Sequence, residues 1–384
     1  MLMKRQKADE RLTLRATHRA VFAQVRQAGT ASRAAIARAT GLSSPAVGAI
    51  AADLLQAGLL EEGDVVDGEG MGRPSRPLQL ERRKPAVVAV QIGVRHTRLA
   101  ALPVAGPTAS TWDVAFKTPA SAAAFSRRLA DAVGALGVRE AVVGVSAPGV
   151  VDEGTGESLL CPNLKWLTGQ NVMGLVGEAF GRRARVCVVQ EIRALALGEL
   201  WAAPARKDFL LVDIGEGVGG AVVVGGQLYQ PPLAMSGELG HVPVLGNKRK
   251  CGCGATGCLE TLVSRSGLVA SSGLRDWPTL VEQLRDGEGG ALPTWLTGTL
   301  DATAAAIAGA LNIVGVREVV VTGALGELPA TVHEHLAAGV ARSAMWARFG
   351  TVTCVAAPRR RAAGLVAAAV ERILLNVEQM KAGV

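Results

Sequence analysis

The stretch Gly237–Glu260, GELGHVPVLGNKRKCGCGATGCLE, decides how this chain is interpreted. It contributes three thiols and one imidazole within 18 residues: His241, Cys251, Cys253 and Cys258. This ligand set is typical of a closed, tetrahedral Cys3His zinc site. Two carboxylates, Glu238 and Glu260, lie close to these ligands in sequence. A metal that only supports structure does not need them, so we expect it to position polar groups for a small, hydroxyl-rich ligand.

The composition indicates a soluble protein with aliphatic cores. A chain of 384 residues suggests two or three domains, and 49% hydrophobic residues with 3% aromatics suffice to pack them. No run approaches the ~20 apolar residues that span a bilayer, and the charged N-terminal residues lack the apolar stretch of a signal peptide. We therefore expect a cytoplasmic protein with no membrane partner. The isolated Cys161, Cys187 and Cys354 are expected to fill cores as thiols.

The first eighty residues differ in charge and pattern from the remainder. Residues 1–60 hold nine Lys/Arg and three Asp/Glu, whereas residues 61–70 hold five acids and no base. Helical periodicity runs from His18 to Ala28, and a second helix is expected from Ser32 to Ala39. A turn at Thr40-Gly41-Leu42 leads to a third helix that begins after Ser43. This spacing predicts a helix-turn-helix, followed by a polar hairpin that we interpret as a wing.

The alternative for this region is a small helical packing domain with no role in DNA binding. The positive charge, the turn at Gly41 and the wing favour DNA. The third helix offers only short polar contacts to base edges and no residue for bidentate base recognition. We expect phosphate contacts from two arginines and minor-groove entry by the arginine of the wing. The predicted DNA-binding residues are Arg33, Arg38, Ser43, Ser44, Pro45, Gly72, Arg73 and Pro74.

From Pro85 onward, apolar strands alternate with Ala-rich helices, which indicates an α/β domain. Two glycine-rich turns follow strands, one at Gly93 and one over residues 215–220, and such turns can present N–H groups to phosphates. The expected strands are Val87–Gly93, Ala141–Gly149, Arg185–Gln190, Phe209–Gly226 and Glu318–Ala324. The expected helices are Ala120–Leu136, Arg193–Trp201, Leu300–Val314 and Gly364–Val377.

These residues resemble the ROK family (repressors, open reading frames and kinases) over nearly the full chain. SRAAIARATGLSSPAVGAIAADLLQAGLL followed by GRP is similar to the winged helix of the family's transcriptional regulators. GVSAPGVVD and PNLKW resemble its sugar-lobe segments, and GELGH with CGCGATGCLE matches its signature.

The resemblance implies an α/β fold in which a winged helix-turn-helix, residues 1–83, precedes a two-lobed, actin-like, sugar-kinase-like domain, residues 84–384. Lobe 1 is expected at about 84–200 plus the C-terminal helix 364–384, and lobe 2 at about 201–363.

In the family the cleft holds a sugar, and this implies roles for matching residues. Glu238 and Glu260 would accept hydrogen bonds from sugar hydroxyls. His241 would bind zinc through one ring nitrogen and donate to a hydroxyl through the other, because the metal fixes its tautomer. Gln190 and Glu191 would also contact the ligand. The alternative is a zinc knuckle with incidental carboxylates.

Three substitutions in the motifs of the family's kinases indicate that this chain is a regulator and not a kinase. Their Asp-x-Gly-Gly-Thr phosphate loop reads Gln91-Ile92-Gly93-Val94-Arg95 here, which removes a carboxylate that helps to hold magnesium. Their general-base Asp is replaced by Glu191, which is one methylene longer, and a misplacement of about 1 Å can cost on the order of a hundredfold in rate. Glu216 stands where kinases favour Thr. We therefore expect neither ATP binding nor catalysis.

The sequence thus predicts a sequence-specific, zinc-containing transcriptional regulator, a repressor that binds double-stranded operator DNA as a homodimer or tetramer and senses a sugar or sugar derivative. Two alternatives stay open. One is an active ATP-dependent sugar kinase with an appended DNA-binding domain. The other is a DNA-binding protein whose sugar lobe serves only as a dimerisation scaffold.

Overall fold

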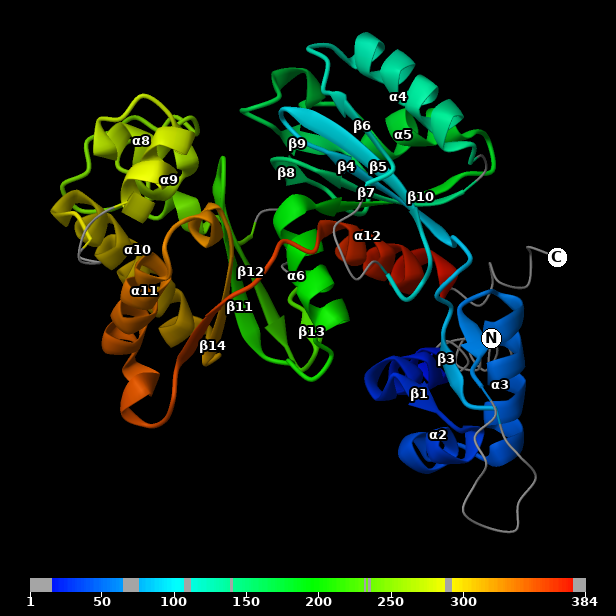
Figure 1. Cartoon of the computed structure of the whole chain (residues 1–384). Coiled ribbons are helices and arrows are strands. Elements are labelled where there is room, and N and C mark those ends of the chain that lie inside the picture. The colour runs from blue at the N-terminus through cyan, green and yellow to red at the C-terminus, as the bar shows by residue number, and fades with distance from the viewer. Residues whose placement is uncertain are drawn as a thin grey trace, which may run out of the picture. The chain divides into compact units, whose positions relative to one another are not determined.

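The computed structural model describes residues 16–64, 76–106, 112–138, 141–230, 233, 236–286 and 292–375 (Figure 1). The chain forms two compact units, one of Met1–Gln190 with Arg361–Val384 and one of Glu191–Arg360. Helix α6 (Glu191–Ala202) belongs to the second unit, whereas the sequence placed it at the end of the first lobe. The reason is packing, because Ile192 and Leu195 of α6 share a core with strands of the second sheet.

The N-terminal region has the predicted helices. Residues 16–28 are helical, and α2 (Arg33–Thr40) and α3 (Ser44–Gln56) follow, with Ser32 and Ser43 as their N-caps. Gly41 ends α2 in the left-handed conformation, with φ +71°, which glycine adopts without steric cost. Three short antiparallel strands complete a winged helix, in the order β1 (Thr30–Ala31), β3 (Leu78–Leu80) and β2 (Leu60–Glu62).

The remainder of the first unit is a five-stranded sheet in the order β10-β7-β4-β5-β6. Strands β10, β7 and β4 are parallel, and β5 and β6 are antiparallel additions. Helices α4 and α5 cover one face, where they share a hydrophobic core with the sheet, and α12 packs on the other (Figure 1). The strands are β4 (Val87–Ile92), β5 (His96–Leu102), β6 (Val114–Lys117), β7 (Val142–Ala147) and β10 (Arg185–Gln190), with the small pair β8 (Val150–Val151) and β9 (Ser158–Leu160). The helices are α4 (Ala122–Leu136), η1 (Lys165–Leu167), α5 (Val172–Phe180), α12 (Arg361–Ala369) and its π-helical continuation η6 (Val370–Leu374).

The second unit repeats this sheet topology in the order β13-β12-β11-β14-β15. Strand β11 again has a parallel neighbour on one side and an antiparallel one on the other. Helix α6 covers one face, and a larger helical layer that includes α10 and α11 covers the other. The strands are β11 (Phe209–Ile214), β12 (Val218–Val224), β13 (Gln227–Leu228), β14 (Glu318–Gly323) and β15 (Thr353–Ala356). The helices are η2 (Leu239–His241), α7 (Glu260–Val263), α8 (Arg265–Ser272), α9 (Trp277–Asp286), α10 (Thr294–Val314), η4 (Ala324–Glu327), α11 (Ala330–Ser343) and η5 (Met345–Arg348).

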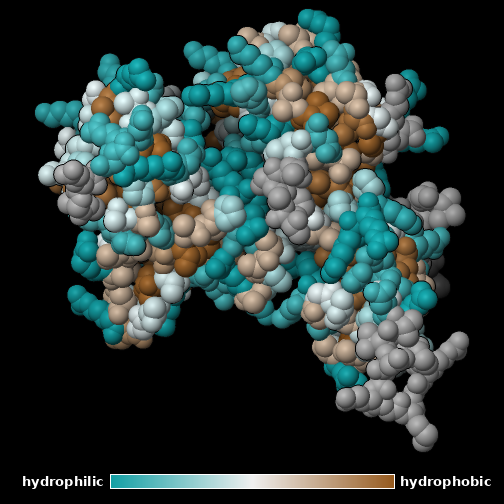
Figure 2. Space-filling view, viewed as in Figure 1, coloured by the Kyte–Doolittle hydropathy of each residue, from teal (hydrophilic) through white to brown (hydrophobic). Residues whose placement is uncertain are grey.

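Among the described residues, α10 is the one helix long and apolar enough to cross a membrane by length and composition alone. Its inner face includes Leu300, Ile307 and Leu311, which are fully buried in the core shared with the second sheet. A core helix of a soluble protein passes the same test. On the face of the molecule drawn in Figure 2, hydrophilic residues are interspersed with apolar ones. The expected cytoplasmic location stays a prediction.

Candidate functional site

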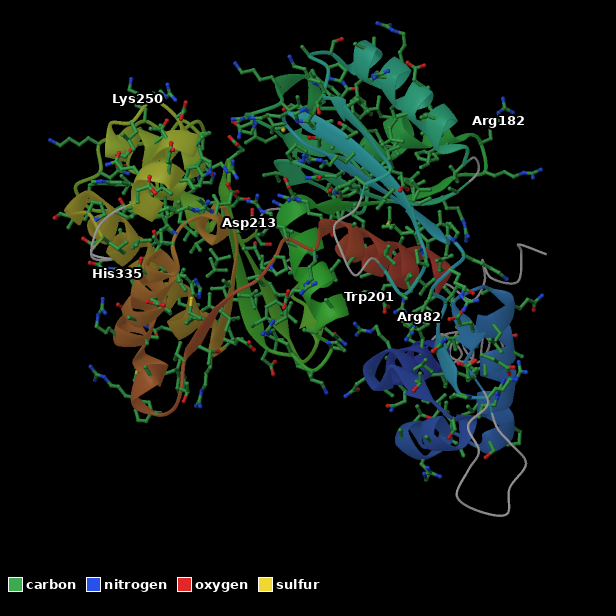
Figure 3. All side chains as sticks on the ribbon, in the orientation of Figure 1. Arg82, Arg182, Trp201, Asp213, Lys250 and His335 are labelled. Atoms are coloured by element: carbon green, nitrogen blue, oxygen red, sulfur yellow. The ribbon has the colours of Figure 1, made fainter. Side chains whose placement is uncertain are left out.

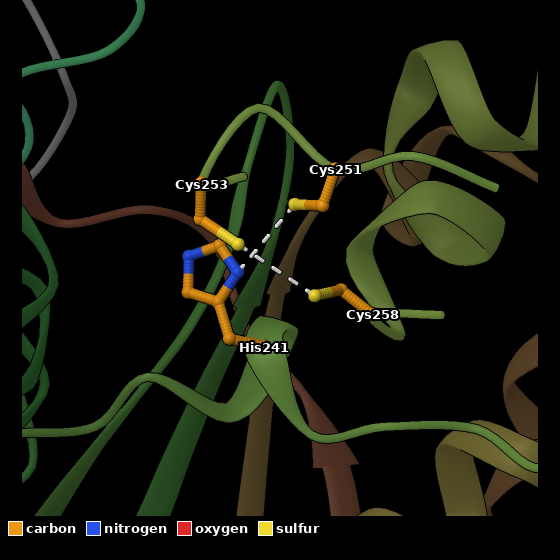
Figure 4. Close-up of side chains that lie close together, drawn as sticks. All are labelled: His241, Cys251, Cys253 and Cys258. Atoms are coloured by element: carbon orange, nitrogen blue, oxygen red, sulfur yellow. Dashed lines mark hydrogen bonds between the residues drawn. The ribbon is translucent and has the colours of Figure 1, made fainter. Parts of the chain in front are cut away.

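The four predicted metal ligands converge in the second unit (Figure 4). Their ligand atoms all lie within 4.8 Å of one another. Cys253 Sγ is 3.7 Å from Cys258 Sγ, and Cys251 Sγ is 3.6 Å from Nδ1 of His241. Zinc bonds of about 2.3 Å to sulfur and about 2.0–2.1 Å to nitrogen imply tetrahedral edges of about 3.8 Å and about 3.6 Å. The group therefore fits a tetrahedral metal ion of zinc's size.

Glycines and two polar side chains shape the loop that carries the thiols. Gly257 has φ +92°, and a Cβ there would lie 2.9 Å from the carbonyl oxygen of Asn247, so glycine is required. The Asn247 amide donates to the Cys258 carbonyl at 3.0 Å. Arg249 donates to the carbonyls of Thr261 and Gly267 at 2.7 and 3.2 Å. These bonds attach the cysteine loop to α7 and α8, so the ligands are held by residues outside the metal set.

The three thiols differ in exposure and in proton affinity. Cys251 and Cys258 are buried, whereas Cys253 is exposed. Burial, reinforced by the neighbouring thiols, raises the pKa of Cys258 to about 12. Cysteine binds metals as the thiolate, so a divalent cation at this position would have to displace protons from buried sulfur. The chemistry of the donor set therefore matches a site that a metal ion would complete.

His241 connects the metal group to a carboxylate. Its Nδ1 faces Cys251, and its Nε2 lies 3.6 Å from Oε2 of Glu238. Both residues stand at the short helix η2, which Gly237 introduces with φ +77°. A Cβ at position 237 would collide with the carbonyl oxygen of Gly220, whose N–H donates to the Gly237 carbonyl at 2.6 Å. The motif Gly-Glu-Leu-Gly-His is thus anchored directly against strand β12.

Glu260 begins α7 and contacts the glycine-rich turn after β11. Its Oε2 accepts a hydrogen bond from the Val218 N–H at 2.9 Å. A Cβ at Gly240 would lie 3.2 Å from the Cβ of Glu260, so the loop carrying Glu238 and His241 also approaches this residue. The predicted carboxylates and the imidazole therefore belong to one local structure in the second unit.

Gln190 and Glu191 lie at the point where the two units join along the chain. Gln190 ends β10, is 6% exposed, and its side-chain oxygen has no hydrogen-bond partner. Its N–H donates to Glu153 at 2.9 Å, and Glu153 also accepts from Arg372 of η6 at 2.6 Å. Glu191 is the first residue of α6. Sequence reasoning did not identify Glu153, because nothing in its local pattern indicates a contact with a residue more than two hundred positions away.

The profile of the ROK family matches residues 87–371. This chain belongs to the ROK family.

Relatives of the chain include both regulators and kinases. A xylose repressor of Caldicellulosiruptor bescii is 26% identical over 255 residues, covering 62% of this chain and 61% of that protein. A glucokinase of Halalkalibacterium halodurans is 30% identical over 201 residues, covering 49% of this chain and 60% of that protein. These matches span less than two thirds of either relative's length.

A solved ROK family transcriptional regulator, described as a homologue of the Escherichia coli MLC protein, superposes with a TM-score of 0.73. The superposition covers 97% of this chain and all of that one at 17% identity, which establishes the fold. The predicted winged helix and ROK-type α/β domain are therefore confirmed.

Several of the predicted DNA-binding residues of this ROK protein are exposed. Arg38, Ser43, Ser44 and Pro45 are exposed at the end of α2 and the start of α3. The Ser43 hydroxyl accepts from the Ala46 N–H at 3.4 Å and so also caps α3.

Arg33 instead pairs with Glu62 at 2.8 Å, which connects α2 to β2. The predicted wing residues Gly72, Arg73 and Pro74 lie outside the described residues.

Proposed function

We propose that this ROK protein is a transcriptional regulator, a repressor, that senses a sugar or sugar derivative and has no kinase activity. The observation that carries the proposal is the double engagement of His241. One ring nitrogen faces the thiols, and the other faces Glu238. A carboxylate beside the outer nitrogen is a common way to orient a metal-bound histidine, but here the same local structure also carries the second carboxylate Glu260, which the metal site does not use. This arrangement therefore favours a ligand-sensing role over a knuckle with incidental carboxylates.

Zinc is the proposed metal, held by His241 and the three cysteines. When bound, it would favour the thiolates electrostatically and fix the His241 tautomer with a proton on Nε2. That N–H can donate to a ligand hydroxyl. Glu238 and Glu260 supply acceptors in the same local structure, and Gln190 is a further proposed contact. Glu191 is the fifth proposed contact. This set suits a polyhydroxylated ligand.

The winged helix is the proposed reader of double-stranded operator DNA. Arg33 and Arg38 would contact phosphates, while Ser43, Ser44 and Pro45 would lie against base edges, with Gly72, Arg73 and Pro74 in the wing. Two heads of a homodimer, or of a dimer pair in a tetramer, would engage half-sites about one helical turn apart or a multiple of that. A sugar would change DNA binding only through its different affinity for the two states of the protein.

The main alternative is an active sugar kinase, and glucokinases do occur among the relatives. Against it stand Gln91 in the first phosphate loop, Glu191 at the general-base position and Glu216 in the second phosphate turn. In the structure, Gln91 is buried and accepts a hydrogen bond from Arg98 at 3.2 Å, so its side chain is engaged within the first sheet. These substitutions remove parts on which phosphoryl transfer depends.

Two assays test the proposal on the full-length protein. A thermal-shift screen against hexoses, pentoses and amino sugars, including D-xylose and D-glucose, should identify at least one stabilising ligand, and Glu238→Ala should abolish the shift. A coupled assay with ATP and magnesium should give no sugar-dependent turnover. Robust turnover would establish the kinase alternative, and a chain that no sugar stabilises would favour a dimerisation scaffold.

A further inference from the structure

The glycine-rich turn that follows β11, residues 215–220, includes the first residues of β12 and has the form of a phosphate-binding turn. Such a turn binds phosphate when its N–H groups and the space above its glycines are available to a ligand. In this protein, groups of the second unit already contact the turn.

Arg359 contacts it from the segment that precedes α12. Its Nε and Nη2 donate to the two carboxylate oxygens of Asp213 at 2.6 and 2.8 Å, a bidentate pair. Asp213 lies on β11, just before the turn (Figure 3). The Thr322 hydroxyl of β14 donates to the same carboxylate at 2.7 Å. The guanidinium is therefore held by Asp213 of β11, and Thr322 of β14 holds that carboxylate in place.

The fixed guanidinium lies directly against the glycines. A Cβ at Gly215 would collide with Arg359 Nη2, and a Cβ at Gly323 would lie 2.7 Å from the same atom. Burial acts to lower the pKa of Arg359, but the nearby carboxylates Asp213, Glu191 and Glu327 outweigh it, so the pKa is raised. The arginine is thus a permanent cation in the space where a glycine-rich turn would receive a ligand.

Three N–H groups of residues 215–220 are also engaged within the protein. The Gly215 N–H donates to the Gly217 carbonyl at 2.8 Å, and the Gly220 N–H donates to Gly237. The Val218 N–H donates to the Glu260 carboxylate, which accepts where a phosphate oxygen would otherwise accept. The Glu260 carboxylate therefore accepts from one N–H of the turn, and the Arg359 guanidinium lies against its glycine Gly215.

We propose that the turn is occupied by the chain itself, with Arg359 as the occupant held by Asp213, and that it is closed to nucleotide phosphates. Arg359 then acts as a positioning residue for the turn that holds Glu260, and the domain needs no nucleotide to present that carboxylate. This inference rests on the proposed function and deepens it, because it explains how the protein would sense a sugar without ATP. Its test is independent of DNA binding.

The test measures binding of Mg·ATP and of inorganic tripolyphosphate to the full-length protein by calorimetry. Wild type should bind neither at millimolar concentration. The double variant Asp213→Asn with Arg359→Ala removes both charges of the pair and opens the space above Gly215. It should bind at least one of the two probes more tightly than wild type by at least about tenfold. Arg360→Ala is the matched control, since the neighbouring arginine pairs with Glu199 and not with the turn, and it should behave as wild type.

Two results would overturn the inference. One is tight Mg·ATP binding by wild type. The other is a double variant that retains its zinc and its cooperative thermal unfolding but binds neither probe. Arg359→Lys adds a second variant that preserves the charge without the bidentate geometry, and it should stay closed to both probes. Operator binding measured on the same samples separates this outcome from the proposed function, because a regulator that fails to bind DNA leaves the phosphate result unaffected.

Discussion

At the scale of single residues, His241 connects the proposed metal site to the proposed ligand site. Its two ring nitrogens face different partners, and a residue with one donor atom could not face both. From donor types and spacing the sequence predicted a site of four donors, and the structure brings these donor atoms within 4.8 Å of one another. It could not predict Arg359, since an arginine outside any motif gives no sign of which carboxylate it will meet.

Replacing a thiol of the metal group should remove the metal. Cys251→Ser and Cys253→Ser should lower the zinc content from about one ion per chain and reduce the melting temperature, because metal binding contributes to folding free energy. Atomic absorption and thermal denaturation measure the two effects. Cys354→Ser is the control, since this cysteine lies in the core of the second unit and away from the metal group, so it should keep its zinc. Full zinc content in Cys251→Ser would contradict the ligand assignment.

The remaining cysteines should be unreactive in the native state. Burial raises the pKa of Cys187 to about 11 and that of Cys354 to about 12, so both are thiols at neutral pH. Because only the thiolate is alkylated, their rates should rise about tenfold per pH unit as pH increases toward those values. Mass spectrometry after iodoacetamide treatment measures this. In chelator-treated protein, the exposed Cys253 should react first, and early modification of Cys187 would contradict the assigned burial.

At the scale of elements, the loop that carries Glu238 requires glycine at position 237, because no other residue fits there without a collision. Gly237→Ala should destabilise the protein by at least about 2 kcal/mol more than Gly246→Ala. Both glycines have positive φ, +77° and +80°, but only at position 237 would a Cβ collide with backbone, and nothing lies within 4 Å at position 246. Urea denaturation of the two variants gives the difference. Equal losses would show that the contact with Gly220 does not hold this loop.

The helix-turn-helix makes a prediction about salt dependence. Arg38 is exposed in the last turn of α2. As a phosphate contact, it should contribute one counter-ion to the binding equilibrium, so Arg38→Ala should reduce the slope of log K against log[salt] by about 0.9. Arg182→Ala, at an exposed arginine of the ROK domain (Figure 3), should leave the slope unchanged. An unchanged slope in Arg38→Ala would remove this residue from the DNA surface.

Elements with strong periodicity were predictable, and others were not. The sequence indicated the helices of the head and the buried strands β4, β7, β10 and β14 within a few residues. It missed β5 and β6, whose partly exposed residues lack a continuous apolar run, and it missed α11. It also merged β11 and β12 into one segment, because the turn that separates them is short and both flanking strands are apolar.

At the scale of the whole molecule, each of the two units contains a five-stranded sheet of the same topology. Each places a central strand between a parallel and an antiparallel neighbour and follows it with a glycine-rich turn. The sequence pattern predicted two such βα sets. It could not predict that the chain itself fills the second turn, since that depends on a contact between Asp213 and Arg359, 146 positions apart.

The central claim is that this ROK protein couples sugar binding to DNA binding without phosphoryl transfer. Its most direct test is a fluorescence-anisotropy titration of the full-length protein on its operator, selected from genomic fragments, at fixed salt, with and without each sugar of the panel and without ATP. We predict that at least one sugar changes the apparent Kd at least about fivefold, and that Glu238→Ala retains operator affinity but loses the response. An operator affinity indifferent to every sugar, or a response that appears only when ATP is added, would contradict the account.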